Sequence, residues 1–331
     1  MIQKKYSIII ISIIVISLFF LLWFFLYLQD NYKNIIESLK IEISQLRQEK
    51  ENLSIIGQIV DKNGFTKEDV DLSTVLLGKL FSPGMNIGFK EPIRIITHDS
   101  NITPVPHTLE AMQKAVDLGV YGIEDDVQFT KDRVPVLLDN PDIAGKKINE
   151  ITSAELKNYR INNLYNIPEL GDAIDFLKGK VKLFIVDLTG IPYLPEGMKI
   201  TDVPVLIQKT ISEHQAEDFV VIQTANPDFL KMIDFDKYLV AWNTFDVQYS
   251  YRNKIDFYTL NPAWYVTYEK RKEIYEAGAE IIPVNVTYAT PEKDAMRYPS
   301  SVLAGNKYIM VDYAEDFIGF CKEYNIPVYG Q

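Results

Sequence analysis

Residues 122–140 read GIEDDVQFTKDRVPVLLDN, and the first half of this stretch has the pattern of a β-strand. Strand side chains alternate between two faces, so Glu124 and Asp126 point to one face and Asp125 to the other. Two carboxylates on one face repel each other unless a cation or a proton lies between them. The pair therefore predicts a site for one divalent cation, Ca²⁺ or Mg²⁺, and a polar strand end exposed to water is the alternative.

Strand-like and helical segments alternate on both sides of this stretch. The apolar run 93–97 suits a buried strand that ends at His98, and Thr108 can cap the helix that follows and stops at Gly119. The other expected strands are 121–129, 182–190, 219–225, 238–242, 256–260, 280–286 and 307–312. Eight apolar strands that alternate with helices predict a (β/α)₈ TIM barrel. A doubly wound open sheet is the alternative, although no Gly-rich phosphate loop follows the first strand.

Polar residues gather at the C-terminal ends of these strands, where the active site of such a barrel lies. They are His98, Glu124, Asp126, Asp187, Asn243 and Asn285. Three carboxylate ligands completed by water suit Ca²⁺ or Mg²⁺, and an imidazole beside them can transfer protons near neutral pH. Each residue alone also has a structural interpretation, because such side chains often cap turns or shape strand ends.

Two tryptophans follow strands or lie in the loops after them. Trp242 and Trp264 could line the mouth of the barrel and bind substrate. Aromatic residues at such positions more often serve packing.

Several motifs occur in an order that is similar to one known family. They are IITHDSN, PHTLEAMQKAVDLGVYGIEDDVQFTKDRVPVLLDNPDI, INEITSAELKNY, IPELGDAIDFLKGKVKLFIVDL and YIMVDYAEDF. Together they resemble the glycerophosphodiester phosphodiesterase family over roughly residues 93–320, most densely over 93–190. The resemblance implies a (β/α)₈ barrel with one divalent cation held by the acids of an E-x-D strand and by an acid on the third strand. Those positions fall on Glu124, Asp126 and Asp187.

The chain departs from the family pattern where positive charge is expected. The opening His-Arg-Gly reads His98-Asp99-Ser100, and Thr189 stands where a lysine commonly follows the third acid. Asp139 occupies the place of the second catalytic histidine. Two cationic groups expected to hold a phosphate anion are therefore missing.

These departures change the proton transfer that the resemblance implies. In the family, one histidine helps a neighbouring hydroxyl to attack phosphorus, and the other protonates the departing alcohol. His98 remains as general base or acid. Asp139 could act as the acid if burial beside the metal carboxylates kept it protonated, and His107, at the head of the first helix, could also reach the mouth.

The composition excludes one class of partner. The chain is 47% hydrophobic and carries a net charge of −11. Nucleic acids need clusters of Lys and Arg, and the sequence has no basic stripe, so we expect no nucleic-acid partner. The single cysteine, Cys321, rules out an internal disulfide.

The N-terminal region predicts a membrane anchor. Residues 8–28 contain no charged side chain, and about 20 apolar residues match the thickness of a bilayer's hydrocarbon core. Lys4 and Lys5 precede this span, so the positive-inside rule places the N-terminus in the cytoplasm and the body of the protein outside it. We therefore assign residues 1–29 to a membrane anchor.

A polar segment with an apolar seam follows the anchor. Residues 30–56 place Ile36, Leu39, Ile43, Leu46 and Leu53 at coiled-coil a and d positions. A short parallel coiled coil would make a homodimer through this stalk, and a single amphipathic helix packed on the body explains the same pattern. Residues 57–92 then read as a connector and residues 93–331 as the barrel.

Three functions are compatible with these features. The first is a membrane-anchored, extracytoplasmic, metal-dependent hydrolase of glycerophosphodiesters or of substrates derived from lipids or wall polymers. The second is a catalytically inactive barrel that serves as a binding or scaffold module at the cell surface. The third is a different lyase or hydrolase reaction on a less anionic substrate.

Overall fold

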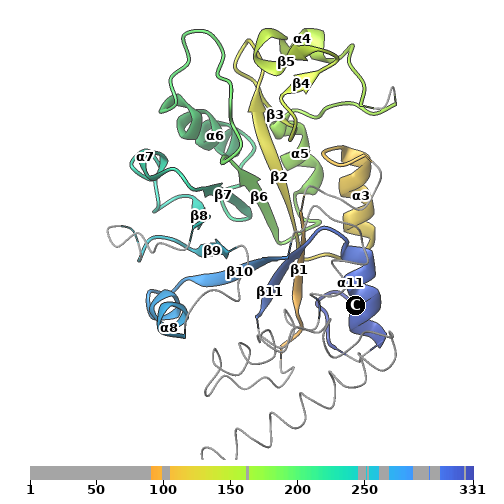
Figure 1. Cartoon of the computed structure of the whole chain (residues 1–331), viewed down its shortest axis with the longest axis vertical. Helices are drawn as coiled ribbons and strands as arrows, with labels where there is room; N and C mark the ends of the chain where they lie inside the picture. The colour runs from red at the N-terminus through yellow and green to blue at the C-terminus, as the bar shows by residue number, and fades with distance from the viewer. Residues whose placement is uncertain are drawn as a thin grey trace, which may run out of the picture. The chain divides into compact units, whose positions relative to one another are not determined.

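The strands that carry the predicted site, labelled in Figure 1, pair side by side in a closed ring of parallel strands. They are β1 (Arg94–Thr97), β2 (Gly122–Phe129), β6 (Leu183–Asp187), β7 (Val220–Thr224), β8 (Leu239–Trp242), β9 (Phe257–Leu260), β10 (Glu280–Asn285) and β11 (Tyr308–Val311). Each pairs in parallel with the next, and β1 pairs with both β11 and β2, so the sheet closes. The predicted TIM barrel is confirmed, because a doubly wound sheet would have two open edges.

The computed structural model describes residues 91–98, 105–161, 164–244, 251, 253–260, 268–285, 298, 306–323 and 326–331. The predicted anchor, the predicted stalk and nearly all of the connector lie outside these ranges. No helix within them is long and apolar enough to cross a membrane.

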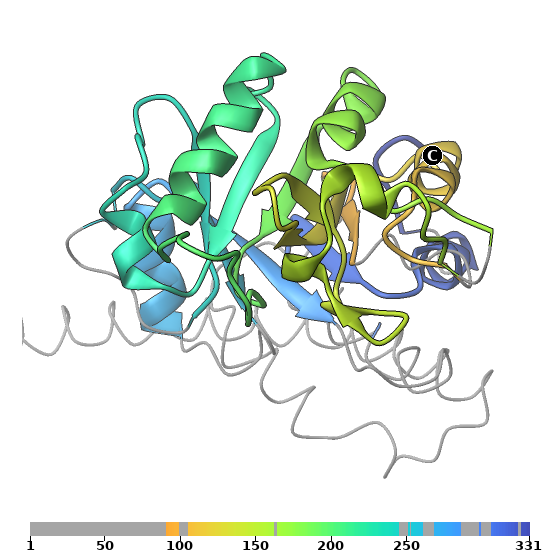
Figure 2. The same cartoon turned by 90° about the horizontal axis from the view of Figure 1, so that it is seen from above.

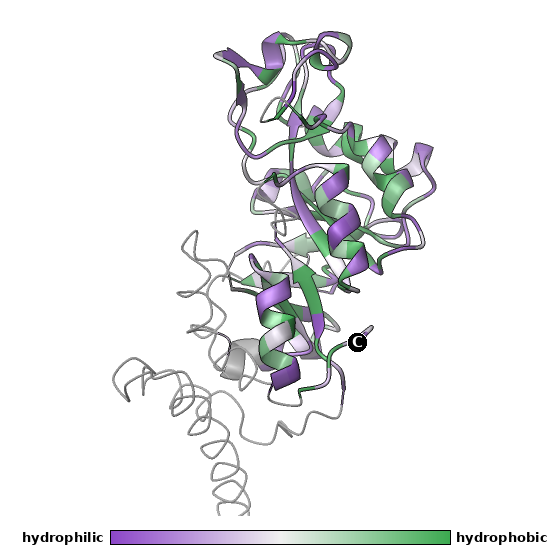
Figure 3. Cartoon of the chain, turned by 90° about the vertical axis from the view of Figure 1, so that its right-hand side faces the viewer, coloured by the Kyte–Doolittle hydropathy of each residue, from purple (hydrophilic) through white to green (hydrophobic). Residues whose placement is uncertain are grey.

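Helices lie on the outside of the barrel strands, as Figure 2 shows from above. The longer ones are α3 (Leu109–Asp117), α5 (Leu170–Leu177), α6 (Asp202–Glu213), α8 (Tyr268–Glu276) and α11 (Ala314–Glu323), and α7 (Pro227–Leu230) is a single turn. Thr108 caps α3 as predicted, because its side chain accepts a hydrogen bond from the backbone N–H of Ala111. Hydrophobic residues occupy one side of several helices and hydrophilic residues the other (Figure 3).

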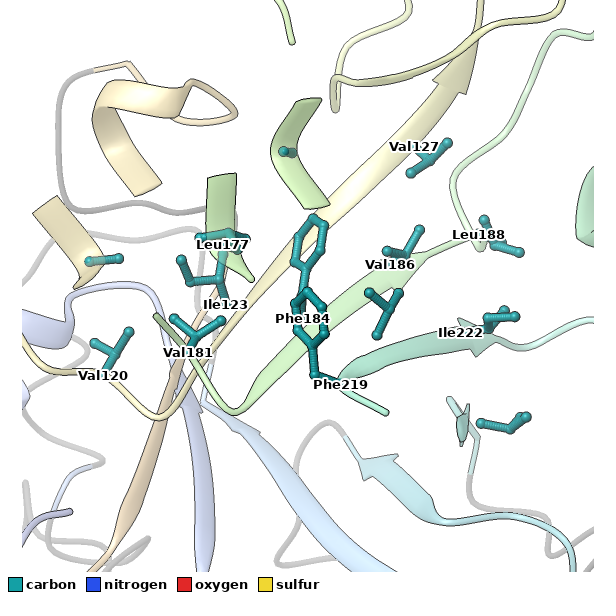
Figure 4. Close-up of a cluster of buried hydrophobic side chains, with 14 of the residues drawn as sticks. Val120, Ile123, Val127, Leu177, Val181, Phe184, Val186, Leu188, Phe219 and Ile222 are labelled. Atoms are coloured by element: carbon teal, nitrogen blue, oxygen red, sulfur yellow. The ribbon is translucent and has the colours of Figure 1, made fainter. Parts of the chain in front are cut away.

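Strand alternation divides the core into two layers. Outward side chains such as Phe184, Val186 and Ile222 pack beneath the helices (Figure 4). Inward side chains such as Ile185 and Val221 fill the barrel interior. Because the two layers use alternate residues of the same strands, the parity of a residue decides whether its side chain faces the site or the helices.

An excursion follows β2 before the chain returns to α5. β3 (Pro135–Leu137) runs antiparallel to the end of β2, and the hairpin of β4 (Asp142–Ile143) and β5 (Lys146–Lys147) comes next. The 3-10 helix η1 (Ile148–Glu150) and α4 (Ser153–Leu156) complete it. The excursion has a small core of its own, made of Val136, Leu138, Ile148, Ile151, Leu156 and Ile167.

The N-terminal end of the barrel is plugged by aromatic rings around one arginine. The Arg94 guanidinium lies 5.1 Å from the ring centroids of both Tyr121 and Tyr308, and its Nη1 donates a 2.8 Å hydrogen bond to Tyr308 Oη. Tyr329, from the C-terminal segment, packs edge-on against Tyr121 at 4.9 Å. Burial raises the pKa of the Tyr121 hydroxyl. The plug leaves the C-terminal ends of the strands as the end where a site can open.

Candidate active site at the barrel mouth

Three acids from two neighbouring strands converge at the mouth, as the sequence predicts. Asp126 in β2 is the register partner of Asp187 in β6, and Glu124 lies two residues earlier on the same face of β2. One carboxylate oxygen from each lies within 4.8 Å of the others. Glu124 and Asp187 are buried and Asp126 is half-buried. Three oxygen ligands gathered within this distance can hold a divalent cation.

Three hydrogen bonds hold the Asp187 carboxylate. Its Oδ1 accepts a 2.7 Å hydrogen bond from the backbone N–H of Thr189, and its Oδ2 accepts from the Thr189 hydroxyl at 2.9 Å and from Gln223 Nε2 at 2.6 Å. Burial raises the pKa of Asp187, while these hydrogen bonds and the charge of His98 act in the opposite direction. Thr189, at the family's lysine position, thus orients the third acid.

His98 is paired with a carboxylate from the last strand of the barrel. Its Nδ1 lies 2.9 Å from Asp312 Oδ1, and its Nε2 lies 3.8 Å from Glu124 Oε2. Asp312 is buried, and the backbone N–H of His98 donates to the Val311 carbonyl at 2.9 Å, which fixes the two strand ends side by side. A carboxylate on Nδ1 favours the tautomer with its proton there, so Nε2 faces the acids.

Sequence analysis missed Asp312 and Gln223 as members of the site. Both are polar residues at or just after the end of a barrel strand, β11 and β7 respectively. The rule that selected Asp187 would also have found them. Gln223 lies two residues after Val221, and Asp312 two residues after Met310. Val221 and Met310 both point into the barrel, so the strand alternation directs Gln223 and Asp312 to the same side.

His107 lies away from the three acids. Its Nδ1 is 2.6 Å from Asp125 Oδ1, and both side chains are buried. Asp125 points outward from β2, as Ile123 and Val127 do, whereas Glu124 and Asp126 point to the other face of the strand. His107 also has a φ of 60°, an uncommon conformation for a residue other than glycine. The contact joins the start of α3 to β2, so the geometry supports a structural role.

Asp139 is placed at the rim but is not buried. The backbone N–H of Leu138 donates a 3.0 Å hydrogen bond to the backbone carbonyl of Asp126, which brings the next residue beside the metal acids. The Asp139 side chain is exposed to solvent. The burial on which its predicted role as acid depends is therefore absent.

The remaining predicted residues divide between the mouth, the core and the undescribed parts. Asn243 follows β8 and is half-buried. It lies two residues after Ala241, which points into the barrel, so the strand alternation directs it to the same side. Trp242 is 1% exposed and belongs to the layer beneath the helices, so its position does not support substrate binding. Asn285 ends β10, but its side chain lies outside the described part, as does Trp264.

A closed barrel with three acids and a carboxylate-paired imidazole at its mouth defines a class of (β/α)₈ protein equipped for cation binding and proton transfer. The sequence model of the glycerophosphoryl diester phosphodiesterase family matches residues 98–274. This is more than half of the 331 residues, so the chain belongs to that family. No curated protein sequence matches the chain.

Solved structures of glycerophosphodiester phosphodiesterases share the fold. One from Parabacteroides distasonis is 18% identical, covers 71% of this chain and 99% of its own, and superposes with a TM-score of 0.57. One from Agrobacterium tumefaciens is 12% identical, covers 69% of this chain and 99% of its own, and has a TM-score of 0.55. An Oleispira antarctica phosphodiesterase was solved with the product sn-glycerol-3-phosphate. It is 16% identical, covers 69% of this chain and 96% of its own, and has a TM-score of 0.56.

Proposed function

We propose that this protein is a membrane-anchored, metal-dependent phosphodiester hydrolase that acts outside the cytoplasm. Its substrates would be glycerophosphodiesters or related diesters derived from lipids or wall polymers. The observation that carries the proposal is the convergence of Glu124, Asp126 and Asp187 with the His98–Asp312 pair at one barrel mouth. Family membership supplies the reaction class.

The three acids fit a hard divalent cation such as Ca²⁺ or Mg²⁺. Burial raises the pKa of Asp187, and a cation bound beside it would favour its charged form. Thr189 and Gln223 hold that carboxylate in one orientation by three hydrogen bonds. When bound there, the cation would offset the negative charge of the acids and polarise a phosphoryl oxygen.

His98 is the group that we assign to proton transfer. Asp312 holds Nδ1, so Nε2 is directed to the acids and can take the proton of the substrate's neighbouring hydroxyl. Asp312 also stabilises the imidazolium that results. Because Asp139 is exposed, water reaches the rim beside Asp126, and we infer that water rather than a second imidazole protonates the leaving alcohol.

Location and assembly form a separate part of the proposal and rest on the sequence. The uncharged run 8–28 supports an N-terminal anchor, and Lys4 and Lys5 support an outward-facing body. The a and d positions of residues 30–56 support a homodimer. Protease protection of the full-length chain in sealed vesicles and its mass in detergent test these two points separately.

The activity test uses the full-length chain with glycerophosphocholine and glycerophosphoglycerol, with and without Ca²⁺ or Mg²⁺. We expect release of glycerol phosphate only with a cation, and Asp126→Asn should abolish both cation binding and turnover. Asp142→Asn removes an exposed carboxylate of β4 and is the matched control. Cation binding measured by calorimetry, together with no turnover of any diester, would contradict the hydrolase.

The loss of the family's second histidine favours the alternative of an inactive binding module. Asp139 at that position is exposed and supplies no imidazole. Under this alternative the cation and the diester would both bind and no bond would break. Measuring binding and turnover on the same preparation therefore separates the two functions.

A further inference from the structure

The loop after β6 runs from the metal acids to the β4–β5 hairpin. At its start, a Cβ placed on Gly190 would lie 3.7 Å from Asp126 Oδ1, so the loop backbone adjoins the acid cluster. Gln128 Nε2 holds this point by donating to the Gly190 carbonyl at 2.8 Å. Further along, Asn149 Nδ2 donates to the Leu194 carbonyl at 3.0 Å. The loop is thus fixed between the mouth and the excursion, at the upper end of Figure 1.

Lys147 brings a positive charge to this fixed loop. Its Nζ lies 3.8 Å from the ring centroid of Tyr193, and both residues are half-buried. The contact is a cation–π interaction, which holds the ammonium without neutralising its charge. Lys147 makes no ion pair with any carboxylate of the described residues.

Lys147 is placed to contact a part of the substrate that lies beyond the scissile phosphate. Tyr193 is three residues beyond Gly190, so its Cα lies at most about 11 Å from that of Gly190, which adjoins the acid cluster. No ion pair joins Lys147 to Glu124, Asp126 or Asp187, so its ammonium stands apart from the carboxylates that would hold the cation. A second phosphate, further along an elongated diester, would meet the ammonium.

Resting on the proposed function, we infer that Lys147 and Tyr193 form a second subsite that binds a non-scissile phosphate of the substrate. The preferred substrates are then diesters with two phosphate groups, and diesters with a cationic head group are disfavoured. Two sources share this chemistry: the deacylated head group of a two-phosphate lipid and a fragment of a glycerol-phosphate polymer. A phosphate that contacts Lys147 forms a charge-assisted hydrogen bond, which supplies the preference.

The neighbouring lysine provides a matched control. Lys146 precedes Lys147 in β5 and points to the other side of the strand. Hydrogen bonds from Thr152, followed by the charges of Lys131 and Lys146, lower the pKa of the exposed Glu155. Lys146→Gln therefore removes the same charge from the same hairpin on the side away from Tyr193.

The test measures the Kd of full-length protein for three probes by calorimetry, with a chelator present so that the cation-dependent hydrolysis does not consume them. They are glycerophosphocholine, glycerophosphoglycerophosphoglycerol as the lipid-derived diester, and a glycerol-phosphate tetramer as the polymer fragment. We expect wild type to bind the probes with several phosphates about tenfold more tightly, and Lys147→Gln to abolish that preference. Lys147→Arg and Lys146→Gln should keep it, and rising salt should weaken it because the Debye length is about 10 Å at 0.1 M.

Two results would overturn the subsite: equal affinities of wild type for all probes, or an unchanged preference in Lys147→Gln. A loss of preference in Lys146→Gln as large as that in Lys147→Gln would also overturn it, because it would show a general effect of hairpin charge. Binding does not depend on turnover. A preference lost only in Lys147→Gln, with no hydrolysis of any probe after Ca²⁺ or Mg²⁺ is added, would sustain the subsite and contradict the hydrolase.

Discussion

Replacing Asp139 by histidine should raise the activity of this protein. The residue occupies the family position of the second catalytic histidine, and the hydrogen bond from Leu138 N–H to the Asp126 carbonyl anchors it at the rim. Because Asp139 is exposed, an imidazole can replace it without burial of a new polar group. The introduced imidazolium would protonate the leaving alcohol, a step that we otherwise assign to water.

The size of the gain follows from the exposure of the site. A positioned general acid contributes about 10²- to 10⁴-fold, and an exposed group on a rim should reach at most the lower end of this range. We expect Asp139→His to raise kcat about 10- to 100-fold, which is about 1.4 to 2.7 kcal/mol off the barrier. The gain should be largest below about pH 6.5, where the imidazole is protonated.

The assay compares two leaving groups. Glycerophosphoglycerol has a poor leaving alcohol and should show the full gain, whereas a nitrophenyl diester of glycerol phosphate needs no acid and should show none. Asp142→His, at an exposed carboxylate of the nearby β4, is the matched control. Equal gains on the two substrates, or no gain while cation binding is intact, would refute the assignment of this step.

Three further predictions test the structural assignments. Trp242→Ala should lower the free energy of unfolding by about 3–5 kcal/mol and leave relative KM values for different diesters unchanged, because Trp242 packs beneath the helices; a selective rise in one KM would indicate substrate contact. His107→Ala should destabilise the fold by about 3 kcal/mol in denaturant titrations, because it removes the buried contact between His107 and the Asp125 carboxylate, and a loss of kcat at unchanged stability would argue against this structural role. The raised pKa of Asp187 means that its contribution to stability is present at acid pH and is lost as pH rises through the folded-state pKa; thermal unfolding with chelator should show this loss, saturating Ca²⁺ or Mg²⁺ should reverse it, and an identical pH profile with and without cation would exclude Asp187 as a ligand.

The shared face of Glu124 and Asp126 was predictable because its signal is local. An E-x-D pair in a strand points to one face whatever the rest of the chain does. Asp187 was predictable because it ends an apolar run that reads as a strand. The barrel itself followed from the alternation of strands and helices, which needs only the order of the elements.

The partners of these residues were harder to predict because they lie far away in the chain. Asp312 and His98 are 214 positions apart and meet only because β1 and β11 close the barrel. Gln223 reaches Asp187 across 36 positions through the pairing of β6 with β7. Their position at strand ends marks Asp312 and Gln223 as candidates, but tertiary pairing decides which side chains they contact.

The sequence by itself determined the fold class, the three acids and His98, because these depend on the period of strands and on the rule that barrel sites lie at strand ends. Only the tertiary structure decided which candidates face that site. It placed Trp242 in the outer layer, joined His107 to the outward Asp125, and left Asp139 in solvent. The physical reason is that side-chain direction and burial depend on strand register and on what covers each edge, and both are set by contacts between distant segments.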